Sequence, residues 1–111
     1  MARDHGPTAG RVRALLAGEP SVREVPMFGG LSFMVDERMV VSARRDGDLL
    51  VRVDPGRYTE LIDRHGARPA EMGSGRSMGT GWLAVPGERT ATDEALRFWL
   101  DVGRHATGGP H

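Results

Sequence analysis

The segment Gly75-Arg76-Ser77-Met78-Gly79 has the spacing G-x-S-x-G, in which the central serine is a nucleophile in many hydrolases. That chemistry requires a strand before the serine and a helix after it, with an aspartate and a histidine placed by a larger parallel sheet. Here the segment leads into the strand-like residues 82–86 of a chain of only 111 residues. The sequence therefore predicts no serine nucleophile, and we identify no catalytic residue.

A glycine-rich loop can also bind an anion, because successive backbone N–H groups point into one concavity. The stretch over residues 73–81 has this composition, with the loop residues Gly73, Gly75, Arg76 and Gly79. Its spacing matches neither nucleotide fingerprint: the Walker loop needs a lysine, and the dinucleotide pattern meets Met78 where it needs glycine. A connecting loop without a ligand is favoured, and a small-ligand or anion-binding loop is the alternative.

Two residue types that carry much of protein chemistry are missing. The chain has no cysteine, which excludes disulfides, thiolate nucleophiles and cysteine-rich zinc sites. All fifteen basic residues are arginine, so lysine bases and Schiff-base chemistry are excluded as well. The histidines are too scattered to form a helical pair of metal ligands: His5, His65, His105 and His111. We therefore predict no metal site, no cofactor and no enzymatic activity.

Short helices and strands must position these residues, and local signals predict three helices. Apolar residues at helical spacing indicate a first helix that Thr8 caps and Gly18 ends. The Asp54-Pro55 pair is an N-cap followed by proline at the first helical position, so a second helix should run to Gly66. A third begins at Thr92, where two acidic residues follow and an apolar stripe then repeats at helical spacing.

Between residues 31 and 53 the apolar pattern becomes strand-like, with turn signals at Asp36-Glu37 and Asp46-Gly47. Two-residue loops at both turns would place Val35 opposite Arg38 and Arg45 opposite Asp48. One face of the resulting meander would then carry Leu31, Phe33, Val35, Val40, Ser42, Leu49, Val51 and Val53. Only one of those residues is polar, which supports this register, because a slip by one residue would scatter the set.

The other face of the meander is only half polar. It receives four apolar residues close together, and we predict that they form an interaction surface: Met34, Met39, Val41 and Leu50. Exposed apolar patches mark interfaces, and methionine suits adaptable contacts. Coverage of this face by the first or third helix is the alternative.

Two further strands, at residues 68–72 and 82–86, complete the predicted order: helix, three-stranded antiparallel meander, helix, two strands, helix. This is an α+β fold, a two-layer sandwich of helices on a sheet. The length suits one domain, over residues 1–105, with a disordered tail over 106–111.

The composition limits which partners and which cellular compartment can be expected for the protein. Hydrophobic residues make up 39% of the chain and charged residues 27%, as in globular domains. Fifteen acidic residues balance the fifteen arginines, so direct nucleic acid binding is not expected, since it usually needs a positive excess. No apolar run is long enough for a membrane span, and we expect a cytoplasmic protein with no membrane contact.

Four segments bear on family membership: Met27-Phe28-Gly29-Gly30-Leu31-Ser32-Phe33-Met34, Leu50-Val51-Arg52-Val53-Asp54, Gly79-Thr80-Gly81-Trp82-Leu83 and Phe98-Trp99-Leu100. Over residues 10–105 the chain resembles the N-terminal domain of the TfoX/Sxy competence regulators. The residues that characterise the motif are Met27, Phe28, Gly29, Gly30 and Trp99.

The resemblance implies a fold like that of the type III secretion chaperones. In the full-length regulators a C-terminal domain follows, and those proteins act with the cAMP receptor protein to switch on genes for DNA uptake. We expect a free-standing N-terminal domain here, a form to which the family assigns no settled activity. The predicted function is a non-enzymatic protein-interaction module, bound to a protein partner or to a second copy of itself, with an indirect role in transcriptional regulation. A small-ligand or anion-binding domain that uses the loop over residues 73–81 is the alternative.

Overall fold

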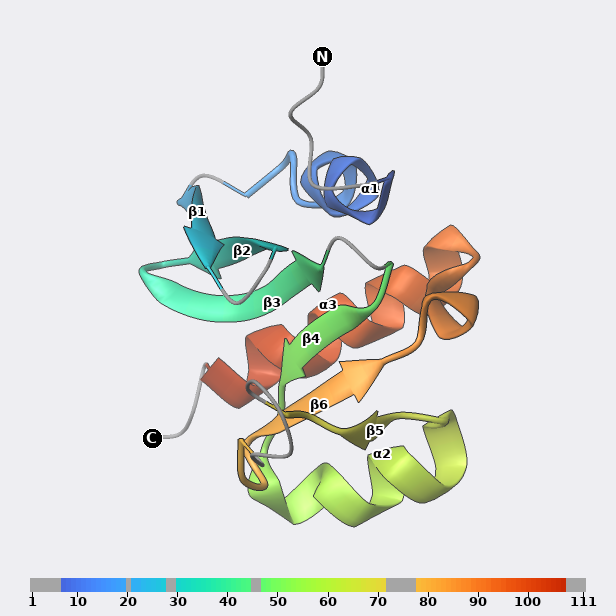
Figure 1. Ribbon diagram of the computed structural model, residues 1–111. Coiled ribbons are helices and arrows are strands. Elements are labelled where there is room, and N and C mark those ends of the chain that lie inside the picture. Colours follow the sequence, from blue (N-terminus) through green and yellow to red (C-terminus); the bar gives the residue numbers. More distant parts are fainter. Residues whose placement is uncertain (1–6, 20, 28–29, 45–46, 72–77, 108–111) are drawn as a thin grey trace.

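The computed structural model of the chain describes residues 7–19, 21–27, 30–44, 47–71 and 78–107. Its elements are α1 (Pro7–Leu15), β1 (Val22–Met27), β2 (Gly30–Val35), β3 (Arg38–Arg44), β4 (Leu49–Arg52), the 3-10 helix η1 (Pro55–Arg57), α2 (Tyr58–His65), β5 (Arg68–Pro69), β6 (Trp82–Val85), the 3-10 helix η2 (Gly87–Thr90) and α3 (Asp93–Thr107). The strands form one antiparallel sheet in the order β1-β2-β3-β4-β6-β5 (Figure 1). The predicted α+β class is confirmed.

The three described α-helices lie on one face of this sheet. The core joins residues of every helix to alternate residues of the central strands: Val12, Leu61, Leu96, Leu31, Phe33, Leu49, Val51, Leu83 and Val85. Leu50, which follows Leu49 in β4, is buried but lies outside that core. Figure 1 shows α3 passing behind β4, and no described helix lies over the nearer face of that strand. The fold is therefore a two-layer sandwich.

The first hairpin departs from the predicted register beyond its turn. Val35 lies opposite Arg38, as predicted, but a bulge between Phe33 and Met34 places Phe33 opposite Val41 and Leu31 opposite Ala43. A bulge inserts one extra residue in a strand, so every later residue of β3 changes face. Val41 and Ala43 consequently join the core instead of Ser42. Val40 keeps its predicted place in the core.

The second hairpin closes on three residues instead of the two predicted. The Arg44 N–H donates to Asp48 O (3.0 Å) and the Gly47 N–H donates to Arg44 O (3.1 Å), so Arg44 and not Arg45 pairs with Asp48. Gly47 has φ 97°, as expected where a left-handed glycine completes a three-residue hairpin loop. This second shift cancels the first, and Leu49 and Val51 face the core as predicted.

Strand β1 was not predicted, and it makes the sheet six-stranded. Its apolar residues do not alternate, and it contains Pro26, a residue that is uncommon within strands. An edge strand tolerates proline, because one side of its backbone needs no ladder hydrogen bonds. At the opposite edge, β5 comprises only Arg68–Pro69 of the predicted strand over 68–72.

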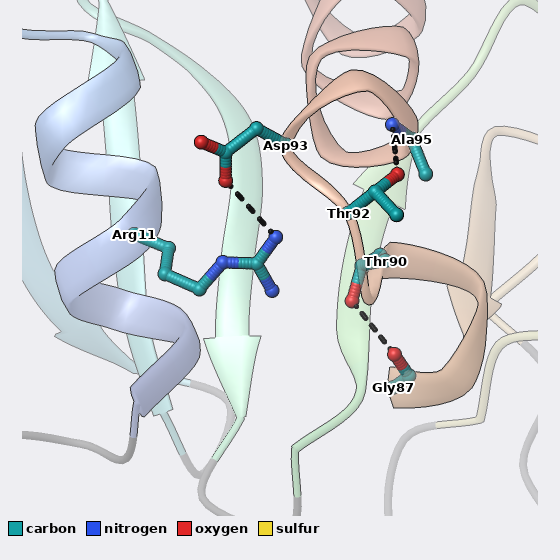
Figure 2. Close-up of polar contacts among 6 residues, drawn as sticks. All are labelled: Arg11, Gly87, Thr90, Thr92, Asp93 and Ala95. Carbon is teal, nitrogen blue, oxygen red and sulfur yellow. Dashed lines mark hydrogen bonds and ion pairs between the residues drawn. The ribbon is translucent and has the colours of Figure 1, made fainter.

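The helix termini largely follow the predicted capping. Asp54 Oδ1 accepts from the Gly56 N–H (2.9 Å), and Gly66 ends α2 in the left-handed region at φ 77°. Thr92 Oγ1 accepts from the Ala95 N–H (3.0 Å) at the start of α3 (Figure 2). Other details differ. Asp54 caps the 3-10 helix η1, and α2 begins only at Tyr58. Helix α1 contains Thr8 and ends at Leu15, before Gly18, and α3 runs through Thr107, so it includes the first residues of the predicted tail.

The turn between β2 and β3 stores strain that glycine would relieve. Asp36 and Glu37 have φ 55° and 66°, a conformation that costs non-glycine residues about 1–2 kcal/mol each. We expect Glu37→Gly to raise the free energy of unfolding by about 0.5–1 kcal/mol, measured by urea denaturation. Glu37→Ala is the control, because it also removes the exposed ion pair with Arg23 (2.6 Å) but keeps the strain. Equal effects of the two substitutions would contradict the prediction.

Candidate functional site

The face of the sheet opposite the helices is the first candidate site, and we call it the open face. Strand register assigns to it Arg23, Val25, Ser32, Met34, Met39, Ser42, Arg44, Leu50, Arg52, Arg68, Trp82 and Ala84. These residues come from all six strands. A surface built on a sheet is preorganised, because the ladder hydrogen bonds fix the backbone that carries each side chain.

The centre of the open face is buried and its surroundings are partly exposed. Ser32 and Ser42 are fully buried and share a hydrogen bond between their hydroxyls (3.1 Å). Leu50, which lies opposite Ser42, is 1% exposed. Half-buried apolar side chains lie around this centre: Val25, Met34, Met39, Trp82 and Ala84. The open face thus has a satisfied polar centre and an apolar surround that a partner could still contact.

The charge of the open face is positive although the chain as a whole is neutral. Among the described residues, four arginines lie on it beside one aspartate, Asp48, which lies opposite Arg44 just before β4 and accepts a hydrogen bond from the Gly87 N–H (3.3 Å). Arg23 is paired with Glu37. The guanidinium of Arg52 lies 5.3 Å from the centroid of the Trp82 ring. Within the described residues no ion pair involves the remaining three arginines, Arg44, Arg52 and Arg68.

The structure corrects where the four predicted interaction residues lie. Met34 and Met39 are opposite one another on the open face and half-buried. Val41 faces the helices and is fully buried, because the bulge in the first hairpin reverses its direction. Leu50 lies on the open face but is buried. Only Met34 and Met39 of the four remain accessible to a partner.

The predicted ligand loop lies mostly outside the described residues, among them Gly73, Gly75 and Arg76. Gly79 is described: it is exposed, with φ 85°. The Met78 N–H donates to Ala70 O (3.0 Å), which ties the end of the loop to the segment after β5. Ligand binding by this loop stays a prediction.

The described motif residues support the fold. Gly30 packs against the backbone of β3, and Trp99 is 2% exposed in the core. Met27 is the last residue of β1, whereas Phe28 and Gly29 fall outside the described residues.

A second candidate site is a hollow of about 400 Å³ where α2, η2 and α3 meet. Its wall includes Arg64, His65, Arg89, Glu94, Phe98 and Trp99. The ring centroids of His65 and Phe98 are 4.6 Å apart, and Phe98 meets Trp99 edge-on at 5.0 Å. Sequence reasoning missed this site, because no local signal connects Arg64 and His65, at the end of one helix, with Arg89 in a later segment.

The described part of the chain contains neither a cluster of metal ligands nor a membrane-spanning helix. No three histidine, aspartate or glutamate side chains gather there as metal ligands would. None of its helices has the length and apolar character needed to cross a membrane.

Comparison with solved structures finds a crystal structure of the Deinococcus radiodurans protein DR2400, described by the domain name DUF419. It superimposes with a TM-score of 0.67 over 86% of this chain and 75% of the other, at 22% sequence identity. That identity supports a shared fold alone. Comparison with curated proteins finds no match. The family model for the TfoX N-terminal domain matches residues 14–106, which is most of the sequence and includes every segment of the resemblance. The chain therefore belongs to the TfoX N-terminal domain family.

Proposed function

We propose that this protein is a non-enzymatic regulatory module that docks a partner protein on the open face of its sheet. The observation that supports it is the placement of all described helices on the other face, which leaves half-buried methionine and tryptophan side chains beside arginines. Membership of the TfoX N-terminal domain family supports a regulatory or interaction role.

The chemistry of the open face favours an acidic partner segment that also carries apolar side chains. Arg44, Arg52 and Arg68 have no ion pair among the described residues and are available to carboxylates. Complementary charge selects the partner and accelerates association, while Met34 and Met39 adapt to its apolar side chains. A second copy of the chain fits less well, because a face-to-face dimer would bring two sets of arginines together.

Two substitutions on the open face test this proposal. We expect Met39→Glu and Arg52→Glu each to weaken partner binding by about tenfold or more, because one places a carboxylate in the apolar contact and the other reverses a complementary charge. Both side chains are at least partly exposed, so circular dichroism and thermal melting should stay close to wild type.

The measurement is affinity capture from the host with the full chain, followed by titration of each captured protein after purification. Arg97→Glu is the matched control, since Arg97 is exposed on α3, far from the open face. A partner lost with both open-face variants and retained with the control supports the proposal. Partners retained by both open-face variants would contradict it, and a dimer in light scattering that Met39→Glu abolishes would favour a second copy instead.

A further inference from the structure

The hollow between α2, η2 and α3 brings two guanidinium groups together without a carboxylate bound to either. Arg64 comes from the last turn of α2 and Arg89 from η2, and neither forms an ion pair among the described residues. Among the described residues of the wall, Glu94 carries the one carboxylate. Two like charges beside one opposite charge leave the hollow positive, which favours an anion inside it.

Backbone packing holds Arg89 at this place. Gly66 ends α2, and a Cβ on it would fall 2.7 Å from Arg89 Cζ, so the guanidinium lies directly against the glycine backbone. The 3-10 helix that carries Arg89 is itself held, because Thr90 is buried and its hydroxyl donates to Gly87 O (3.0 Å), as Figure 2 shows. The Arg89 N–H donates to Pro86 O (2.8 Å). These contacts fix the backbone of η2 and place the exposed guanidinium of Arg89 against Gly66, beside the hollow.

An aromatic wall adjoins the two arginines. The rings of His65 and Phe98 lie at 32° to each other, and Phe98 meets Trp99 at 81°. Trp99 is nearly fully buried, so the partly exposed surface of this wall belongs to His65 and Phe98. Flat rings favour stacked or edge-on contact with another ring, while guanidinium groups bind oxyanions through paired N–H donors.

We propose that this hollow binds a small planar organic anion, a flat ring that carries a carboxylate or a phosphate. Arg64 and Arg89 bind the oxyanion and the His65–Phe98 pair contacts the ring. The residues of this wall belong to the helix layer, and none of them lies on the open face.

The test is a titration of the full chain with benzoate, followed by amide and arginine side-chain NMR signals. We expect saturable shifts at Arg89 Nε–H and at the Glu94 and Ala95 amides, with a dissociation constant of about 1 mM for so small a ligand. Benzyl alcohol keeps the ring but lacks the charge, and inorganic phosphate is an oxyanion without a ring. Each should bind at least about tenfold more weakly than benzoate.

Two variants complete the experiment. Arg89→Gln should weaken benzoate binding at least about tenfold, whereas Arg97→Gln, an exposed arginine of α3 outside the hollow, should leave it unchanged. Benzoate shifts that never saturate would overturn the proposal, as would equal affinity for benzyl alcohol or undiminished binding by Arg89→Gln. If phosphate binds as tightly as benzoate, the ring contributes nothing to binding, and the proposal that the ligand is planar is wrong. None of these outcomes bears on the open face, whose test uses other residues.

Discussion

Replacement of Trp99 by alanine is expected to lower the free energy of unfolding by about 3–5 kcal/mol. Trp99 is 2% exposed and contacts two other rings, Phe98 at 5.0 Å and His65 at 6.2 Å between centroids. It therefore connects α3 both to the core and to the end of α2. Removal of the indole leaves a cavity between α3, the end of α2 and the core, and these packed parts cannot easily close it. Because domains of this size have total stabilities of about 5–15 kcal/mol, the variant should be only marginally folded.

Urea denaturation followed by circular dichroism measures this effect, with Trp82→Ala as the control. Trp82 is half-buried on the open face, so its replacement should lower the free energy of unfolding by about 1–2 kcal/mol, well below the decrease expected at Trp99. A Trp99→Ala midpoint equal to that of the wild type would show that this residue is not part of the core. Equal losses for the two variants would show that the two faces of the sheet are equally packed.

The second large effect is expected at Gly30, where alanine should destabilise the protein by about 2–4 kcal/mol. A Cβ at this position would collide with Ala43 O and would lie 2.7 Å from Arg44 Cα. Both atoms belong to the backbone of β3, which has no rotamer through which to move aside. Strands β2 and β3 would have to separate where Gly30 and Arg44 pair. Close backbone approach therefore explains this glycine of the family motif.

Gly10→Ala is the matched control for this glycine substitution. Gly10 is exposed within α1, and a Cβ there would meet no atom within 4 Å. Alanine in an open helical position should stabilise the protein by about 0.5–1 kcal/mol. The two alanine variants should consequently shift the urea midpoint in opposite directions. A neutral Gly30→Ala would indicate that the two strands can part locally, and Gly30 would then need an explanation other than packing.

Residues close in sequence account for most of what could be predicted. The cap at Asp54, the left-handed end at Gly66 and the cap at Thr92 each depend on hydrogen bonds or dihedral angles within a few residues. The α+β class followed from the change between helical and strand periods. Family membership followed from short motifs whose order along the chain could be read directly.

Irregularities in the strands could not be predicted in the same way. The bulge beside Phe33 and the three-residue loop before Asp48 each shift the register by one residue, and periodicity alone cannot distinguish such a shift from a regular hairpin. Val41 was assigned to the wrong face for this reason. The bulge and the longer second loop cancel at β4, so the predicted orientation of Leu49 and Val51 was right although the register between them and the first turn differed from expectation.

The sequence by itself determined the presence of three helices, the signals at Asp54, Gly66 and Thr92, the class of fold and the family, because these depend on local interactions and on patterns along one chain. Only the tertiary structure decided which face of the sheet the helices cover and which arginines are left there, since that depends on how distant segments pack. The hollow at the α2–α3 junction has the same origin. Arg64 and Arg89 belong to different elements, and packing of η2 against Gly66 brings their charges to one place.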